Sequence, residues 1–197
     1  MKILIILSAI FMLMSSSDKI NAQQKKSVEA GLYLTSNDFQ QKKITYEIDR
    51  SDAKNKIKLN SFFGSSTGYK LTKGEKHEFN KKKIYGYRSL DNKNYRFYNG
   101  EAYVVIDTAG FYMYYQYKNE ENIKGKEPVK RDEYFFSKKA NDGLQLLTIE
   151  NLKNSFPGNH HFHYDLDANF RSDADLVAYD SFQKIYKIKY WYNQSAK

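Results

Sequence analysis

The chain of 197 residues contains no cysteine. That absence excludes structural disulfides, thiolate metal ligation, a thiol nucleophile and a lipid-modified cysteine. Proline is almost absent too, with only Pro128 and Pro157, whereas tyrosine occurs 18 times and phenylalanine 13 times. This balance favours strands over long flexible linkers. The fold must therefore be held together by the packing of its side chains.

Arginine is scarce in a chain that is otherwise basic. Lysine and arginine together number 32 against 23 acidic residues, a formal net charge of +9, yet arginine stands only at positions 50, 88, 96, 131 and 171. Recognition of bases and phosphates favours the arginine fork, so the composition argues against a nucleic-acid partner. The charge fits either a solvated lysine surface or attraction to anionic glycans, the cell envelope or acidic proteins.

Long apolar runs are missing after the N-terminal segment. Residues 1–22 have the pattern of a secretory signal, in which Lys2 precedes an apolar run from Ile3 to Met14 and small or polar residues lead to Ala22. About twelve apolar residues fall short of the roughly 20 that cross a hydrocarbon core. We therefore expect cleavage after Ala22 and a periplasmic or secreted protein without a transmembrane span.

The middle of the chain contains four strand-like segments separated by turn signals. The segments are 84–90, 94–98, 102–106 and 111–117. Asn99-Gly100 is the strongest of the turn signals, because both central residues of a type I′ turn need positive φ. The sequence therefore predicts a four-stranded antiparallel meander.

Further strands are expected on both sides of the meander. They are 31–35, 44–49, 56–60 and 69–73 before it, and 133–137 and 144–147 after it, whereas the charged segment 120–131 is expected to be a loop. So many antiparallel strands must curl or close to bury an aromatic face. We predict an α+β protein with a curled sheet or partly open barrel over 23–147, packed by C-terminal helices of the same domain over 148–197.

The C-terminal region changes to helical periodicity. One helix is expected over 148–156, and Phe162, Leu166 and Phe170 at spacing four mark the face of a second. Ser172 is expected to cap a longer helix that continues to about residue 193. Residues 186–192 also alternate as a strand would, and a helix is preferred because no turn residue separates them from the predicted helical run.

Three of the four histidines stand together at His160, His161 and His163. With Asn159 as a helix cap, His160, His163 and Asp167 fall on one stripe and offer a transition metal two nitrogens and an oxygen. No H-E-x-x-H pattern is present, and no fourth ligand can be named. The stretch is interpreted first as a helix start, with a metal site at these three residues as the alternative.

Two other motifs match known sites only in part. The run 64–68 fits the G-x-S-x-G pattern of a nucleophile elbow around Ser66, but strand-like residues follow it where a helix is required. Asp165, Asp167 and Asn169 begin like a calcium loop, yet position six is Phe170 and position twelve is Leu176. We therefore predict a hairpin loop for the first, a helical surface for the second, and no catalytic residue in either.

Aromatic side chains provide a different kind of candidate site, namely Tyr112, Tyr114 and Trp191. Tyrosine and tryptophan rings stack on sugars and other ligands while their polar tips remain solvated. Tyr112 and Tyr114 point opposite to Met113 and Tyr115, so one of these two faces belongs to the core and the other meets solvent, a groove or the C-terminal helix. Packing against that helix is the preferred interpretation.

Several segments resemble uncharacterised exported proteins of Bacteroidota. They are 31–39, 84–88 with 94–98, and 178–182, together with the Asn-Ala-Gln junction at 21–23. The resemblance covers most of the mature chain and implies export, and it implies no catalytic or binding residue.

The function expected from these features is that of an exported non-enzymatic binding or envelope-associated protein. One alternative is a hydrolase of envelope or dietary polymers, whose acid and base carboxylates would meet only in the fold. Another is a metal-binding protein that uses His160 and His163.

Overall fold

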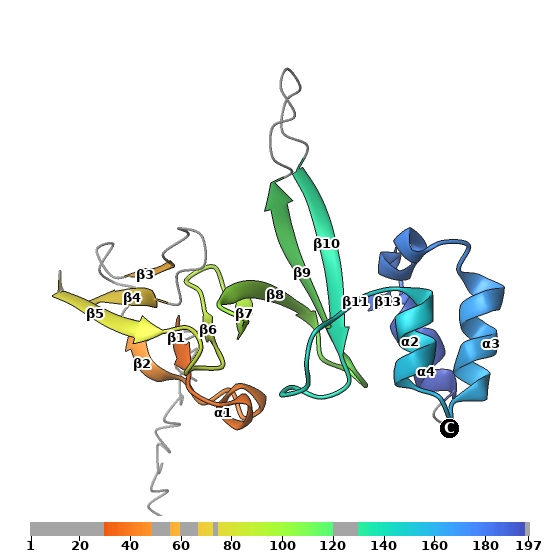
Figure 1. Ribbon diagram of the computed structural model, residues 1–197, viewed down its shortest axis with the longest axis horizontal. Helices are drawn as coiled ribbons and strands as arrows, with labels where there is room; N and C mark the ends of the chain where they lie inside the picture. The colour runs from red at the N-terminus through yellow and green to blue at the C-terminus, as the bar shows by residue number, and fades with distance from the viewer. Residues whose placement is uncertain (1–29, 49–55, 60–66, 73–74, 120–129, 196–197) are drawn as a thin grey trace, which may run out of the picture.

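The structure, a computed structural model, describes residues 30–48, 56–59, 67–72, 75–119 and 130–195. Its centre is an eight-stranded antiparallel sheet in the order β11-β10-β9-β8-β7-β6-β1-β2 (Figure 1). The strands are β1 (Ala30–Tyr33), β2 (Thr45–Ile48), β6 (Gly86–Arg88), β7 (Asn94–Tyr98), β8 (Glu101–Asp107), β9 (Tyr112–Asn119), β10 (Lys130–Ser137) and β11 (Gln145–Leu146). The sheet is curled and open, with β11 and β2 at its edges, so the predicted α+β class is confirmed.

The predicted meander is formed by β6 to β9, each strand pairing with the next. Asn99 and Gly100 join β7 to β8 with φ of 51° and 84°, as a type I′ turn requires. One strand begins earlier than expected: β10 starts at Lys130, so the end of the predicted loop belongs to a strand that pairs with β9 along its whole length. The remainder of that predicted loop, 120–129, lies outside the described residues.

A second sheet consists of β3 (Lys56–Leu59), β4 (Thr67–Thr72) and β5 (Glu75–Asn80). It lies at the end of the molecule opposite the C-terminal helices (Figure 1). Phe79 of β5 joins it to the main sheet, with its ring centroid 6.1 Å from that of Phe97. Strand β5 was not predicted, because Glu-Lys-His-Glu-Phe-Asn has a single apolar residue and forms a strand through its pairing with β4.

Helix α1 (Ser36–Gln40) was also missed, although a local signal marks it. Thr35 and Asp38 form a capping box, in which the Thr35 hydroxyl accepts the Asp38 N–H and the Asp38 carboxylate accepts the Thr35 N–H. Phe39 of this helix is buried and packs against Tyr33. The short helix therefore covers part of one face of the sheet.

The C-terminal region confirms two predicted helices, α2 (Ile149–Ser155) and α3 (His160–Asn169), with the Asn159 side chain capping α3 as expected. The long helix predicted after Ser172 is wrong. The chain forms a 3₁₀ turn η1 (Asp173–Val177), the hairpin β12 (Tyr179–Asp180) and β13 (Ile185–Tyr186), and only then α4 (Lys187–Ser195). Asp180 explains the break, since its carboxylate accepts the backbone N–H groups of Phe182 and Gln183 and stabilises a turn.

The main core lies between the helices and one face of β9 and β10. Its buried members are Phe111, Met113, Phe136, Leu147, Leu152, Phe162, Leu166, Phe170, Leu176 and Ile188. A smaller cluster of Leu32, Tyr87 and Phe97 lies toward the second sheet. None of the helices in the described ranges is long and apolar enough to cross a bilayer. The predicted signal at 1–22 lies outside those ranges.

Candidate functional site

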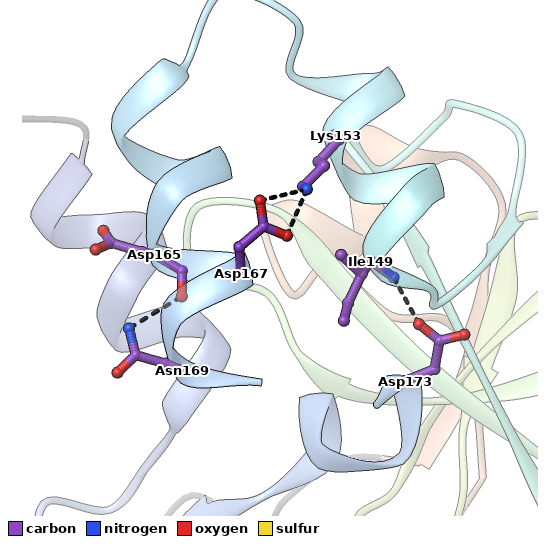
Figure 2. Close-up of polar contacts among 6 residues, drawn as sticks. All are labelled: Ile149, Lys153, Asp165, Asp167, Asn169 and Asp173. Carbon is purple, nitrogen blue, oxygen red and sulfur yellow. Dashed lines mark hydrogen bonds and ion pairs between the residues drawn. The ribbon is translucent and has the colours of Figure 1, made fainter. Parts of the chain in front are cut away.

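Two acidic side chains of the C-terminal region, Asp167 of α3 and Asp173 of η1, are engaged in structural contacts (Figure 2). Lys153 Nζ of α2 lies 2.5 Å and 2.7 Å from the two carboxylate oxygens of Asp167. Asp173 accepts the Ile149 N–H at 2.8 Å, so it satisfies a free donor at the start of α2. These contacts hold α2, α3 and η1 against one another.

The predicted metal residues are brought together only in part. The rings of His160 and His163 face each other edge to face with centroids 6.1 Å apart. His163 donates from Nε2 to the Phe156 carbonyl at 2.9 Å, and Asp167 has Lys153 as its partner. Among the described residues, no group of three or more histidine and acidic side chains is arranged to hold an ion. A site at His160, His163 and Asp167 therefore stays a prediction, and forming it would require Asp167 to leave Lys153.

The two other motifs are accounted for by local structure where it is described. Asp165 and Asn169 belong to α3, and the Asn169 amide donates to the Asp165 backbone carbonyl at 2.9 Å (Figure 2). Ser66 lies outside the described residues. Strand β4 begins at Thr67, directly after it, where a nucleophile elbow would need a helix.

Tyr112 and Tyr114 lie on the face of β9 that the C-terminal helices do not cover. Those helices pack against Phe111 and Met113, so the expected packing of one β9 face on the C-terminal helices occurs on the Met113 side. Tyr112 accepts a hydrogen bond from Gln40 of α1 at 3.1 Å, and Tyr114 has no exposed surface. Tyr114 is thus part of the interior, and a ligand site that includes it would need a rearrangement.

Tyr114 forms part of a buried cluster around Arg96. The guanidinium lies 5.4–5.6 Å from the ring centroids of Tyr85, Tyr98 and Tyr114 and donates to the Tyr114 hydroxyl at 3.0 Å. It also donates to the Asp142 carbonyl at 2.5 Å. Burial raises the pKa of Tyr85 and of Tyr114, so both hydroxyls stay neutral at physiological pH. The positive charge is therefore balanced by oxygen dipoles and ring faces, which suit a structural role.

Trp191, the third predicted aromatic, lines an open pocket. We call it the hairpin pocket, and its volume is about 330 Å³. Its lining comes from the end of α3, the β12–β13 hairpin and α4, and consists of Asn169, Asp180, Gln183, Ile185, Lys187, Tyr190 and Trp191. A volume of this size falls at the lower end of the range typical of small-ligand sites, roughly 300 Å³ upward.

The hairpin pocket combines aromatic rings with polar groups that have no described partner. The rings of Tyr190 and Trp191 meet edge to face with centroids 5.1 Å apart. In the described ranges, no hydrogen bond or ion pair engages the side chains of four lining residues: Gln183, Lys187, Tyr190 and Trp191. The Gln183 amide and the Lys187 ammonium are therefore exposed at the pocket, whereas Tyr190 and Trp191 are half-buried and Trp191 also packs against the main core.

Two contacts fix the walls of this pocket. The Asp180 carboxylate accepts the N–H groups of Phe182 and Gln183, each at 2.9 Å, which orders the hairpin turn. Lys189 anchors α4 on the other side, because its ammonium is fully buried and donates to the carbonyls of Ala109 and Phe111 in the β8–β9 turn. Within two residues of Lys189 in α4 lie Lys187, Tyr190 and Trp191, so this anchor positions the aromatic wall.

A second pocket of about 310 Å³ lies at the other end of the sheet, between β2, β3 and β6. Its lining includes Arg88, Ser89 and Asp91, and Asp91 is paired with Lys93 at 3.1 Å. Ile48 and Lys56 also line it, and they border the segment 49–55, which is not described.

Trp191 was predicted from the sequence, but the other residues around it were not. Asp180 and Ser181 are turn formers, and they were the available signal for a hairpin there. Asn169 of α3 could be connected to Lys187 of α4 only through the tertiary fold, since 18 positions separate them in the sequence.

Comparison with known proteins adds no family. No protein-family model matches the chain, and no curated protein and no solved structure matches it significantly.

Proposed function

We propose that this chain is an exported, non-enzymatic binding protein and that the hairpin pocket binds a sugar residue of a glycan. The observation that carries the proposal is the lining of that pocket. Trp191 and Tyr190 offer ring faces to the apolar face of a sugar, and Gln183 offers an amide to its hydroxyl groups. Rings combined with a few unpartnered polar groups are what a polyhydroxylated ligand requires.

The charge of the pocket favours an acidic sugar. Lys187 is the lining cation, and no described residue pairs with it. The one lining carboxylate, Asp180, already accepts two backbone N–H groups. A uronic acid or another anionic unit would gain a charge-assisted hydrogen bond to Lys187 and attraction from the net positive charge of the chain.

The arrangement of carboxylates supports binding over hydrolysis. Glycoside hydrolysis generally needs two carboxyl groups, roughly 5 to 9.5 Å apart, on either side of the scissile bond. Asp180 is the acidic residue among the described lining of the hairpin pocket, and Asp91 is the one in the second pocket. Neither described lining contains a pair.

The proposal is tested by titrating the protein with acidic and neutral oligosaccharides. Trp191 is the only tryptophan of the chain, so tryptophan fluorescence reports directly on the pocket. Oligogalacturonides and hyaluronan fragments are expected to change the emission saturably, and uncharged malto-oligosaccharides to bind more weakly. Calorimetry with Gln183→Ala and Lys187→Ala is expected to show about fivefold weaker binding for each lost hydrogen bond of about 1 kcal/mol.

Tyr164→Ala is the matched control, because Tyr164 is a strongly exposed aromatic of α3 that does not line the pocket. It should bind as the wild type does. A protein that leaves the emission of Trp191 unchanged with every oligosaccharide, or pocket variants that bind like Tyr164→Ala, would contradict the proposal.

A further inference from the structure

Phe182 is the most exposed large apolar side chain among the described residues, with 94% of its surface accessible. It stands in the β12–β13 turn, between Asp180 and Gln183, which both line the hairpin pocket. Single exposed apolar residues are common on protein surfaces and need no explanation by themselves. The position of this one, within the segment that forms a pocket wall, is what gives it meaning.

The turn that carries Phe182 is ordered by several contacts. The backbone N–H of Phe182 itself donates to Asp180 at 2.9 Å. The rings of Tyr179 and Tyr186 pack edge to face across the hairpin at 5.0 Å, and the Lys187 N–H donates to the Ala178 carbonyl at 2.9 Å. A phenyl ring on a fixed turn loses little conformational freedom on binding, so more of its burial contributes to affinity.

The residue type is unusual for the tip of a short hairpin. Turns are dominated by glycine, proline, asparagine, aspartate and serine, which the turn geometry itself favours. Asp180 and Ser181 fit that rule and Phe182 does not. Removing a hydrated phenyl ring from water is favourable, and the folded chain by itself does not gain that free energy at Phe182.

We propose that Phe182 stacks on a second sugar of the same glycan chain whose neighbouring unit occupies the hairpin pocket. This rests on the proposed function and specifies its ligand: a glycan chain, read across at least two units, instead of a single sugar. The pocket supplies the polar contacts and the charge to one unit through Gln183 and Lys187. Phe182 supplies a ring face to the next, beyond the pocket rim.

The test compares affinities along a length series. Wild type and Phe182→Ala are titrated with galacturonic acid and with its oligomers of increasing length, using the emission of Trp191, which the substitution leaves in place. The two proteins are expected to bind the single sugar equally. The wild type is expected to bind longer oligomers about five- to tenfold more tightly than Phe182→Ala, as one stacked ring pair allows.

Two matched variants isolate the role of the ring. Phe182→Tyr keeps an aromatic face and is expected to retain the preference for longer chains. Tyr164→Ala removes an exposed ring elsewhere and should leave the whole series unchanged. Phe182 is 94% exposed, so all variants are expected to fold, and circular dichroism is the check.

The outcomes separate the two proposals. Glycans that bind with the same length dependence in wild type and Phe182→Ala overturn the role of Phe182 and leave the pocket proposal standing. Failure of every glycan to bind overturns both. Two further results would show that Phe182 contacts something other than a glycan chain. In the first, Phe182→Ala loses cosedimentation with anionic lipid vesicles while its glycan series stays unchanged. In the second, Phe182→Ala loses self-association in sedimentation while its glycan series stays unchanged.

Discussion

Lys189 Nζ of α4 lies 3.6 Å from Asp107 Oδ1 at the end of β8, and the lysine side chain has no exposed surface. The same ammonium donates to the carbonyls of Ala109 and Phe111 and lies 3.6 Å from the centroid of the Phe111 ring. Burial is the largest effect on this group and lowers its pKa to about 7, against the weaker opposing effect of Asp107. The contact that holds the C-terminal helix to the sheet is therefore sensitive to pH.

The first prediction is that Lys189 makes stability depend on pH above neutrality. Between pH 7 and about pH 10, the unfolded chain binds a proton at this lysine that the folded chain has lost, so the free energy of unfolding rises with pH. The slope is at most about 1.4 kcal/mol per pH unit. Below pH 7 the lysine is charged in both states, and its contribution no longer changes. Urea unfolding of wild type and Lys189→Met from pH 6 to 9 measures the difference.

Lys189→Met removes the titrating group but keeps a long apolar side chain. Its free energy of unfolding should be lower than that of the wild type, because the carbonyls of Ala109 and Phe111 lose their donor. Above pH 7, its free energy of unfolding should change less with pH than that of the wild type. Equal slopes for the two proteins would mean that the buried lysine keeps its ordinary pKa. Lys187→Met, two residues away in the sequence and exposed, is the control for loss of a lysine charge.

The second prediction concerns Arg96, whose buried charge depends on the Tyr114 hydroxyl. Tyr114→Phe removes an oxygen that accepts from Arg96 at 3.0 Å and also lies 3.0 Å from Ser137 Oγ. We expect a loss of about 1 to 3 kcal/mol in the free energy of unfolding, because two buried polar groups each lose a partner. Tyr112→Phe is the control: it removes a more exposed hydroxyl bonded to Gln40 and should cost less than about 0.5 kcal/mol. Urea denaturation that gives the two variants equal stability would contradict the prediction.

The parts of the fold that the sequence predicted are those set by neighbouring residues. Asn99-Gly100 requires a tight turn, and Asn159 caps the helix that follows it, each within a few positions. The missed elements depend on distant partners or on a misjudged turn. β5 has one apolar residue and forms because β4 pairs with it, whereas Asp180 breaks a run of helical periodicity through its own side chain.

The candidate site was harder to predict than the fold. Trp191 was singled out because tryptophan combines an apolar ring with a polar tip, but its neighbours in the pocket come from three elements. Tyr114 looked equally suitable on strand β9 and is buried, because α1 and Arg96 cover a face that alternation alone leaves undecided. Periodicity assigns a side chain to one face of a strand, and only the tertiary fold determines what covers that face.

The third prediction tests the metal alternative. An ion bound by His160, His163 and Asp167 must displace the Lys153 ammonium from Asp167. We therefore expect Lys153→Ala to take up zinc, nickel or copper more tightly than the wild type, and a double His160→Ala, His163→Ala variant to lose that uptake. Equilibrium dialysis of untagged protein measures both. Equal uptake by wild type and the double histidine variant would rule out this site, and His161→Ala controls for the loss of an imidazole beside it.

The fourth prediction links the hairpin turn to the pocket through Asp180. Asp180→Ala removes the acceptor of two backbone N–H groups, which lowers the free energy of unfolding by about 1 kcal/mol and leaves those amides open to solvent. Amide hydrogen exchange should therefore accelerate at Phe182 and Gln183, whereas the amides of α3 keep their protection.

Asp180→Asn keeps a carbonyl oxygen at the same position and should retain most of the protection. Asp165→Ala is the matched control, because the described contact of Asp165 uses its backbone carbonyl. Unchanged exchange at Phe182 in Asp180→Ala would show that the carboxylate does not order the turn. In that case, weaker glycan binding by Asp180→Ala would have to come from a direct contact between Asp180 and the sugar.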